Sequence, residues 1–589
     1  PIDQDYRSCI LIYNEGDDCI TPTIIGFTIQ NGIGTEVIRN PGDPDTEEPQ
    51  ILGGGVLAGV SEPIIRYNRF RDNGSTDVDS GGGIYLSTDP EDFGFDNRKT
   101  SRARCDVEEF DLSNNMYNGN EAIFGNTFAN RYFEEIFDMS ESIFDVANCQ
   151  EDEVSPVWVY VEPESSTDFS GSETNLCAIT VPDVYVDSNI NQECIEEGCG
   201  TQQNPFKTIA WALAMILPSE DYPITLHLAN GTYSPETGEL FPIVLPSYVN
   251  LQGEDEDLTI IDAQETNRVI NIWSSVQNSL SMLTVTGGSS GGISIYHSDP
   301  IIEGVTINEN SSSSSGGGIS LFYASPILHQ VQITNNYTSS TGGGISIDIS
   351  DPTLNNVTIF NNVAEYNGGG IEMVFSYSAI LTDVTIEDNQ SLNSSGGGMY
   401  LYVSSPTLNH VTIDGNMAYG GAGGGMNVLY SELCESELIM TDVLISDNYS
   451  SEHGGGMYIS DSDINMAGVT IEENTANWRG GGIYISGCRP IMNQLKIIKN
   501  TANISGGGMR IASCEVNMAY VLIDGNIALE EGGGLHISNS YTTIIQAIIT
   551  NNSANANSGV VHLKDWGVMD SHPYPYSTLD LKNTIIWDN

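Results

Sequence analysis

The stretch GGGISIDISDPTLNNVTIFNNVAEYN spans residues 342–367, and the next residue, Gly368, starts the same pattern again. The glycine run returns at steps of 26 to 31 residues, beginning at Gly316, Gly342, Gly368, Gly396, Gly423, Gly454, Gly480, Gly506 and Gly532. A fixed period of 20 to 50 residues is typical of a solenoid, in which each repeat forms one turn of a stack. Most of this chain is therefore predicted to be a stack of similar turns.

Each repeat predicts short strands and no helix. After the glycines, apolar residues alternate with polar ones, as at Ile345 and Ile347 around Ser346, which is the period of a strand with one buried face. A second apolar series follows in Leu354 and in Val357–Ile359, separated by a bend. Three short strands in about 26 residues predict an all-β fold, a right-handed parallel β-helix solenoid with about eleven turns in residues 266–589.

An asparagine follows two residues after the last strand of most repeats. Stacked in register, such side chains can hydrogen-bond to the turn backbone and to one another. Three of these positions, Asn310, Asn336 and Asn448, also match the acceptor triplet for N-linked glycans, but the asparagine persists where the triplet fails. We therefore favour a structural ladder, which includes Asn336, Asn362, Asn389, Asn474, Asn500 and Asn526.

Residues 183–265 read differently from the repeats. Tyr185-Val-Asp, Asn204-Pro-Phe-Lys-Thr-Ile, Gly231-Thr-Tyr and Ile261-Asp-Ala occur in that order, and Ala210–Ile216 favours a short helix. This series resembles the N-terminal cap module of bacterial secreted right-handed parallel β-helix proteins with a pectate-lyase-like solenoid. The repeats after it are similar to the passenger of chlamydial polymorphic outer-membrane proteins.

The same patterns divide the chain into four parts. Residues 1–150 contain partial repeats, such as Gly53-Gly-Gly-Val and Gly81-Gly-Gly-Ile, and predict a first β-helix module with irregular loops. Residues 151–182 predict a junction, residues 183–265 the cap module and residues 266–589 the main β-helix. Both ends of the sequence lie within this pattern, so we expect self-association through stacked β-helix ends.

The composition is strongly acidic, with 79 Asp and Glu against 19 Lys and Arg and a net charge of −60. Such a surface excludes nucleic acid as a partner, because it cannot neutralise phosphates. It suits solubility and loose binding of divalent cations. The acidic loops offer hard oxygen ligands for Ca²⁺, which is the expected ion, at Asp43, Asp45, Glu47, Glu254 and Asp257.

The ten cysteines favour an oxidising compartment. Cys488 and Cys514 are 26 residues apart, so they occupy equivalent positions on adjacent turns, within disulfide range. Two further disulfides are predicted as local loop closures, Cys9–Cys19 and Cys194–Cys199, and a metal site is the alternative for the second pair. The sequence has no run of 18 apolar residues, so no transmembrane segment is expected. We expect a secreted bacterial protein, extracellular or at the cell surface, and a processed or partial product.

The glycine-led strands present a row of outward side chains where a ligand could bind. Asp348 and Glu372 are its acids, and we interpret them as solvated because no cation accompanies them. A second stripe offers planar rings and polar groups that could grip a sugar chain, although cross-turn stacking is the favoured alternative. This stripe consists of Tyr400, Tyr458, Tyr484, Arg510, His536 and His562.

We find no convincing catalytic constellation in the sequence and expect no enzyme. The preferred function is a structural or adhesive one, in which a rigid rod assembles end to end into an extracellular filament or layer. The alternative is a polysaccharide-binding or polysaccharide-cleaving β-helix protein. A trimeric phage-like fibre is a third hypothesis.

Overall fold

The computed structural model describes residues 181–587, apart from 192–198, 217, 432–436, 557–558 and 565–575. Before residue 181 it describes short segments, which are 10–13, 23–25, 27–30, 35–37, 50–59, 64–66, 69–71, 83–87, 109–112, 116–118, 128–131, 136–138, 143–144, 159–160 and 166–168.

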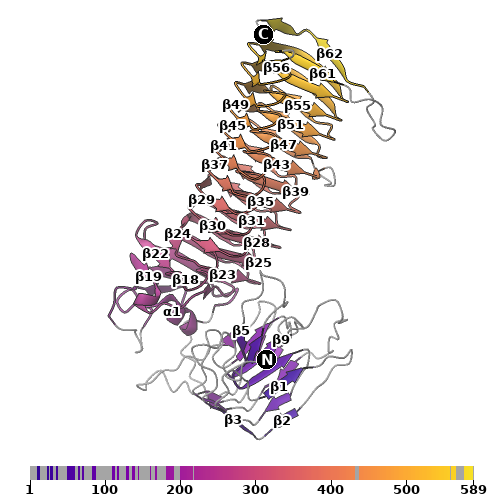
Figure 1. Ribbon diagram of the computed structural model, residues 1–589. Coiled ribbons are helices and arrows are strands. Elements are labelled where there is room, and N and C mark those ends of the chain that lie inside the picture. The colour runs from indigo at the N-terminus through magenta and orange to yellow at the C-terminus, as the bar shows by residue number, and fades with distance from the viewer. Residues whose placement is uncertain are drawn as a thin grey trace.

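One repeat makes one coil of backbone around a common axis. The coil that starts at residue 345 runs through β31 (Ile345–Asp348), β32 (Thr353–Asn355), β33 (Thr358–Phe360) and β34 (Val363–Ala364). Each of these strands pairs in parallel with its equivalent 26 or 27 residues on, as Ile345 pairs with Ile371 and Thr358 with Thr385. The coils stack into the long rod seen in Figure 1. The fold is the predicted parallel β-helix.

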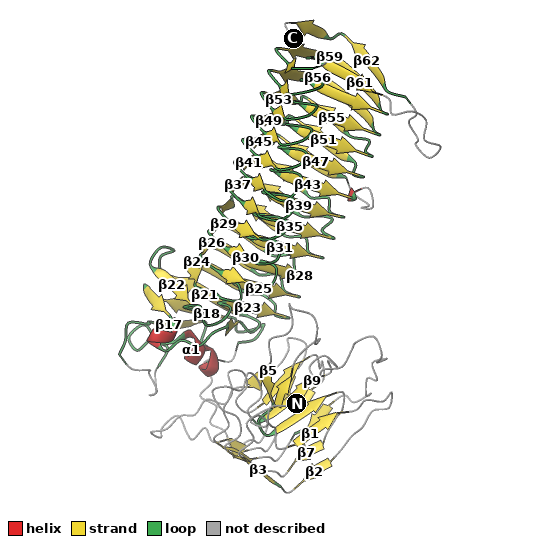
Figure 2. Cartoon of the chain, in the orientation of Figure 1, coloured by secondary structure: helices red, strands yellow, loops and turns green. Residues whose placement is uncertain are grey.

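Three long sheets form the walls of the rod (Figure 2). A 24-stranded sheet runs from β17 (Asp183–Val186) to β63 (Ile585–Trp587), and a 10-stranded sheet consists of two-residue strands from β27 (Ser311–Ser312) to β60 (Ser553–Ala554). The glycine-led strands form a 13-stranded sheet, hereafter the glycine-led sheet. Its members are β20 (Ile243–Val244), β23 (Ile270–Trp273), β25 (Ile293–Tyr296), β28 (Ile319–Phe322), β31, β35 (Ile371–Val374), β39 (Met399–Tyr402), β43 (Met426–Leu429), β47 (Met457–Ser460), β51 (Ile483–Ser486), β55 (Met509–Ala512), β58 (Leu535–Ser538) and β61 (Val561–Lys564).

The core is a set of apolar columns that run along the inside of the rod. Ile345, Ile347, Leu354 and Ile359 of one coil are all fully buried, and their equivalents in neighbouring coils are buried as well. Alternation puts these side chains inside and their neighbours outside. A Cβ at Gly481 would overlap the carbonyl oxygen of Gly507 in the next coil, so the glycine allows adjacent turns to approach closely.

The asparagines form a continuous buried ladder at one corner. Asn474 donates from Nδ2 to Asn500 Oδ1 (3.0 Å) and to the carbonyl of Ile445 (2.9 Å), and its own Oδ1 accepts the N–H of Asn448 (3.0 Å). The residue before it, Glu473, takes the left-handed conformation at the corner (φ 58°). The ladder asparagines are at most 1% exposed, so the candidate glycan acceptors among them are buried in the fold.

A second ladder, which the sequence did not suggest, closes the corner after the glycine-led strands. Here the side chain of a Ser or Cys accepts a hydrogen bond from the backbone N–H of the equivalent residue in the preceding coil. The same side chain donates to the backbone carbonyl of the residue two positions before it in the sequence. Cys488 and Cys514 belong to this ladder and are free thiols, so the predicted disulfide between them is not formed. Its links include Ser462 N–Cys488 Sγ (3.5 Å), Cys488 N–Cys514 Sγ (3.3 Å) and Cys514 N–Ser540 Oγ (3.0 Å).

Of the other predicted disulfides, Cys199 is bonded, but its predicted partner Cys194 lies outside the described residues. Cys9 and Cys19 lie outside them as well. Both pairings therefore stay predictions.

A short helix packs at the first coils of the rod. Helix α1 (Ile209–Met215) begins after Thr208, whose Oγ1 accepts the N–H of Trp211 (3.2 Å). The buried carboxylate of Glu239 accepts the N–H groups of Ile209 (2.6 Å) and Ala210 (2.9 Å), so the first donors of the helix are satisfied. Ile209 belongs to the same apolar core as the strands of the rod. A 3₁₀ turn, Pro235–Thr237, follows.

The segments before residue 181 form smaller sheets with an apolar core of their own, and all are parallel except the antiparallel pair β4 (Thr35–Val37) and β5 (Gln50–Leu52). One sheet has the order β1 (Ile10–Tyr13), β6 (Val56–Gly59), β9 (Ile84–Ser87), β12 (Phe128–Arg131) and β15 (Val159–Tyr160). The predicted division of the chain into modules at residues 150, 182 and 265 stays a prediction. Parallel pairing continues through β12, in a region where the sequence period predicted irregular loops.

We predict that Asn474→Ala destabilises the rod by about 2–4 kcal/mol, because it removes several buried hydrogen bonds and leaves backbone partners unsatisfied. Urea unfolding followed by far-UV circular dichroism measures the change. Asn503→Ala is the matched control, since Asn503 is an exposed amide that donates to the exposed Asn477 Oδ1 (2.7 Å). Equal losses for the two variants would contradict a stabilising role of the buried ladder.

Candidate functional site

The predicted stripe lies on the outer face of the glycine-led sheet, at the second residue of each strand. Tyr458, Tyr484, Arg510, His536 and His562 pair with one another in that order on β47, β51, β55, β58 and β61. Asn427 on β43 separates Tyr400 from the others. The structure therefore brings five of the six predicted residues into one uninterrupted column.

A second column covers part of the first. It consists of the residue just before each glycine run, and His453, Arg479, Ser505 and Glu531 form successive parallel bridges within it. The outward side chains of the strands, which the alternation of a strand would expose, are therefore enclosed by this second column. Arg510 is 5% exposed and His536 is 3% exposed.

Aromatic rings gather at the N-terminal end of this site. Tyr458 and Tyr484 stack with their centroids 5.2 Å apart, and the ring of His453 stacks on Tyr484 at 4.7 Å. Trp478 meets His453 edge to face at 5.3 Å and is 44% exposed. Burial, together with the charges of Arg479 and Arg510, lowers the pKa of His453 to about 4, so this ring is neutral at pH 7.

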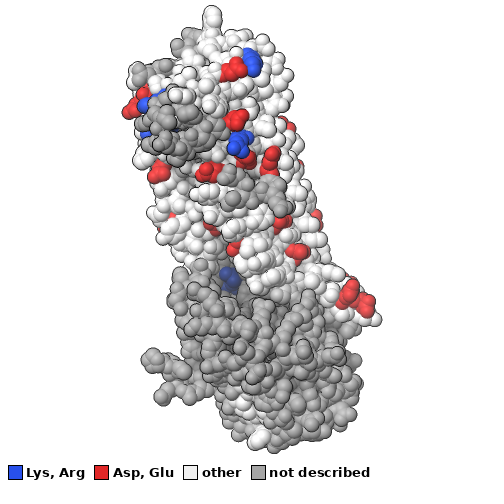
Figure 3. Space-filling view, turned by 90° about the vertical axis from the view of Figure 1, so that its right-hand side faces the viewer, with Lys and Arg blue, Asp and Glu red and all other residues white. Residues whose placement is uncertain are grey.

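Basic groups follow the rings along the column. The Arg510 guanidinium donates to the carbonyl of Ile511 (2.7 Å) and to Ser538 Oγ (2.8 Å), and burial lowers its pKa to about 10. On the face shown in Figure 3, the visible Lys and Arg side chains lie mainly toward the C-terminal end of the rod. Asp and Glu side chains stand among them at this end of the rod.

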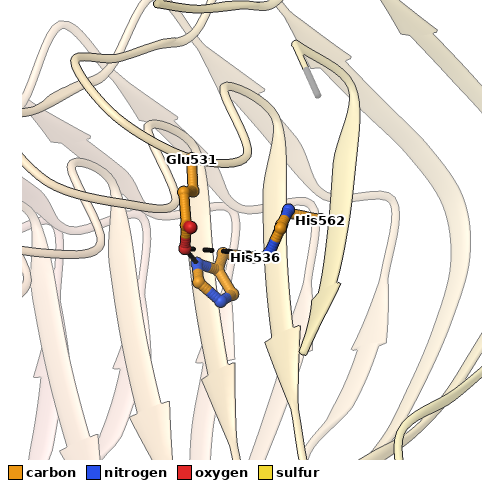
Figure 4. Close-up of side chains that lie close together, drawn as sticks. All are labelled: Glu531, His536 and His562. Carbon is orange, nitrogen blue, oxygen red and sulfur yellow. Dashed lines mark ion pairs between the residues drawn. The ribbon is translucent and has the colours of Figure 1, made fainter. Parts of the chain in front are cut away.

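Three potential ligand side chains converge at the C-terminal end of the column, as Figure 4 shows. Glu531 Oε2 lies 3.9 Å from His536 Nδ1 and 3.7 Å from His562 Nε2. The Lys564 ammonium also approaches Glu531 Oε2, at 3.4 Å. Sequence reasoning placed both histidines in the stripe but missed Glu531. Its only signal is its place directly before Gly532, in the column that covers the strands.

Of the two acids on the outward row, Glu372 is not solvated as the sequence suggested, whereas Asp348 is partly exposed. Glu372 on β35 is 8% exposed and accepts the hydroxyl of Thr341 from the covering column. Burial raises the pKa of Glu372 to about 7. The charge of Asp348 also raises it, whereas the hydrogen bond from Thr341 lowers it. Burial also raises the pKa of nearby Tyr400 to about 12. Glu372 therefore changes its charge near neutral pH.

The calcium candidates remain predictions. Asp43, Asp45 and Glu47 lie outside the described residues. Glu254 accepts the N–H of Asn230 (3.3 Å), whereas Asp257 lines an open acidic pocket on the 24-stranded sheet.

We predict that Glu372→Gln makes the rod less sensitive to alkaline pH. The folded pKa is above the ordinary value of 4.5, so the native state holds a proton that the unfolded state has already lost. Wild-type stability relative to the variant is therefore greatest in acid and falls as the pH rises from 5 to 8, by on the order of 3 kcal/mol. Urea unfolding of both proteins at the two pH values measures this. A difference independent of pH would contradict it, and Glu387→Gln on β37 (Thr385–Glu387) controls for the loss of a carboxylate.

Comparison with known proteins identifies two matching sequence families. Residues 195–397 match the family described as "Protein of unknown function (DUF1565)", and residues 468–486 match the Chlamydia polymorphic membrane protein repeat. No curated protein matches the chain. The second match lies within the repeats that resemble the chlamydial passenger.

Several solved structures are similar to the chain at low identity. The mannuronan C-5 epimerase AlgE6 A-module of Azotobacter vinelandii is 14% identical, with a TM-score of 0.30 over 62% of this chain and 90% of that one. Pectin methylesterase PemA from Erwinia chrysanthemi is 10% identical, with a TM-score of 0.23 over 53% and 90%. Likeness at this level says nothing about activity. Among the described residues, no helix has the length and hydropathy that a membrane crossing requires. From its coils and its repeats, the chain is a parallel β-helix repeat protein.

Proposed function

We propose that this protein is a secreted or surface-exposed β-helix rod that binds glycan chains on its glycine-led sheet. The observation that carries the proposal is the aromatic group of His453, Tyr458, Trp478 and Tyr484 beside the basic groups of the same column. Planar rings with adjacent polar groups are the usual means by which proteins hold sugars.

The rings have different roles in this proposal. Tyr458 and Tyr484 stack on each other, and His453 covers Tyr484, so these three occupy one another's faces and stiffen the platform. Trp478 touches His453 only edge to face and is 44% exposed, which leaves ring surface for a sugar. Arg479, the next residue, supplies a cation that can pair with a carboxylate or sulfate group of the glycan.

The rod supplies rigidity and length. Because every coil is hydrogen-bonded to its two neighbours, the site is held on a stiff wall, and ordering it costs little on binding. The match to the Chlamydia polymorphic membrane protein repeat supports placement at the cell surface or outside the cell. An adhesive role follows from a fixed glycan site on a long support, and end-to-end assembly stays a separate prediction.

We expect Trp478→Ala to weaken glycan binding at least about tenfold, the loss of roughly 1.4 kcal/mol of stacking. A glycan array of neutral and uronate-containing chains identifies a ligand, and calorimetry with that ligand measures the affinity. Tyr520→Ala is the matched control, since Tyr520 is 57% exposed on β56 (Glu515–Asp524) of the 24-stranded sheet. No binding on the array, or binding that Trp478→Ala leaves unchanged, would overturn the proposal.

A further inference from the structure

We propose that Glu531, His536 and His562 form a binding site for a divalent transition-metal ion of the zinc class. Glu531 comes from the covering column and the two histidines from adjacent strands, and one ligand atom from each side chain lies within 4.8 Å of the other two. Two imidazoles and a carboxylate are a familiar ligand set for zinc, and they leave a fourth position open.

The distances are close to those of a loaded site. Ligand atoms about 2.1 Å from one tetrahedral ion lie roughly 3.4 Å from each other. The carboxylate of Glu531 is 3.9 Å from His536 Nδ1 and 3.7 Å from His562 Nε2. The ligand atoms of the two histidines also lie within 4.8 Å of each other, so all three separations shorten when an ion binds.

His536 provides the independent reason to expect a ligand. Its side chain is 4% exposed, and neither ring nitrogen has a hydrogen-bond partner within the described part of the chain. An unsatisfied buried polar group is costly, so an imidazole enclosed in this way requires an explanation. A metal ion would use one of these nitrogens. His562 and Glu531 are only partly buried, so an ion can enter from solvent.

Two cations oppose the ion and limit its affinity. Lys564 Nζ lies 3.4 Å from Glu531 Oε2 and must move when the carboxylate turns to a metal. Arg510, on the adjacent strand, stays in place through its bonds to Ile511 and Ser538. We therefore expect a dissociation constant in the micromolar range, which corresponds to a binding free energy of about −8 kcal/mol.

The test is calorimetric titration of ZnCl₂ into the full chain, with millimolar CaCl₂ present to occupy hard carboxylate sites. Wild type is expected to bind one ion of this affinity, and Co²⁺ in its place is expected to give the visible absorption of a tetrahedral site. His562→Gln and Glu531→Gln should each weaken the stoichiometric binding at least tenfold. Lys564→Met should tighten it about two- to fivefold by removing the competing cation.

His410→Gln is the matched control, because His410 is an exposed histidine 3.7 Å from both Asp383 and Asp442. It should leave the stoichiometric binding unchanged, and so should Trp478→Ala, which separates this site from the glycan platform. Circular dichroism checks that each variant is folded. Absence of stoichiometric binding in wild type, or binding that survives in both His562→Gln and Glu531→Gln, would overturn the proposal.

Discussion

The whole structure depends on parallel hydrogen bonding between coils that lie in register. Once Ile319, Ile345 and Ile371 pair in sequence, every side chain is placed directly above its equivalent in the coil before. Residues that are distant in sequence become neighbours at the spacing of two strands. Apolar positions merge into core columns, and polar positions pair along a column or with the column beside it.

The site follows from the same rule. A column that changes gradually from aromatic to basic to imidazole side chains places different chemistry at successive heights on one wall. Tyr484 stacks on Tyr458 because the two occupy equivalent positions, and His536 meets His562 for the same reason. The chain has a net charge of −60, and burial of Arg510 separates its guanidinium from the acidic side chains of the surface and holds it within the column.

The sequence was sufficient for the features that repeat. Alternation around Ser346 located the core, and the spacing of Asn474 and Asn500 located a ladder corner. The sequence was insufficient where equivalent positions in successive coils carry different residue types. Arg479, Ser505 and Glu531 stand in one column but are of three different residue types, so the sequence did not reveal that they form a column. For the same reason it did not reveal that this column buries Arg510 and Glu372. The thiols of Cys488 and Cys514 suggested a covalent bond, because the serines that they replace had not been recognised as a ladder. Pairing of β12 with β9 was missed because 44 residues separate Phe128 from its partner Ile84.

The two corner ladders also give the rod a direction. Asn310 donates to Asn336, Asn336 to Asn362, and so on to Asn552, always toward the C-terminal coil. The N–H groups of Ser462, Cys488 and Cys514 donate the same way at the other corner. Aligned dipoles reinforce one another along such chains, so within each ladder the links have one direction, with the donor in one coil and the acceptor in the next coil toward the C-terminus. A second copy that continued these ladders would have to join head to tail, which generates a polar filament rather than a closed symmetric pair.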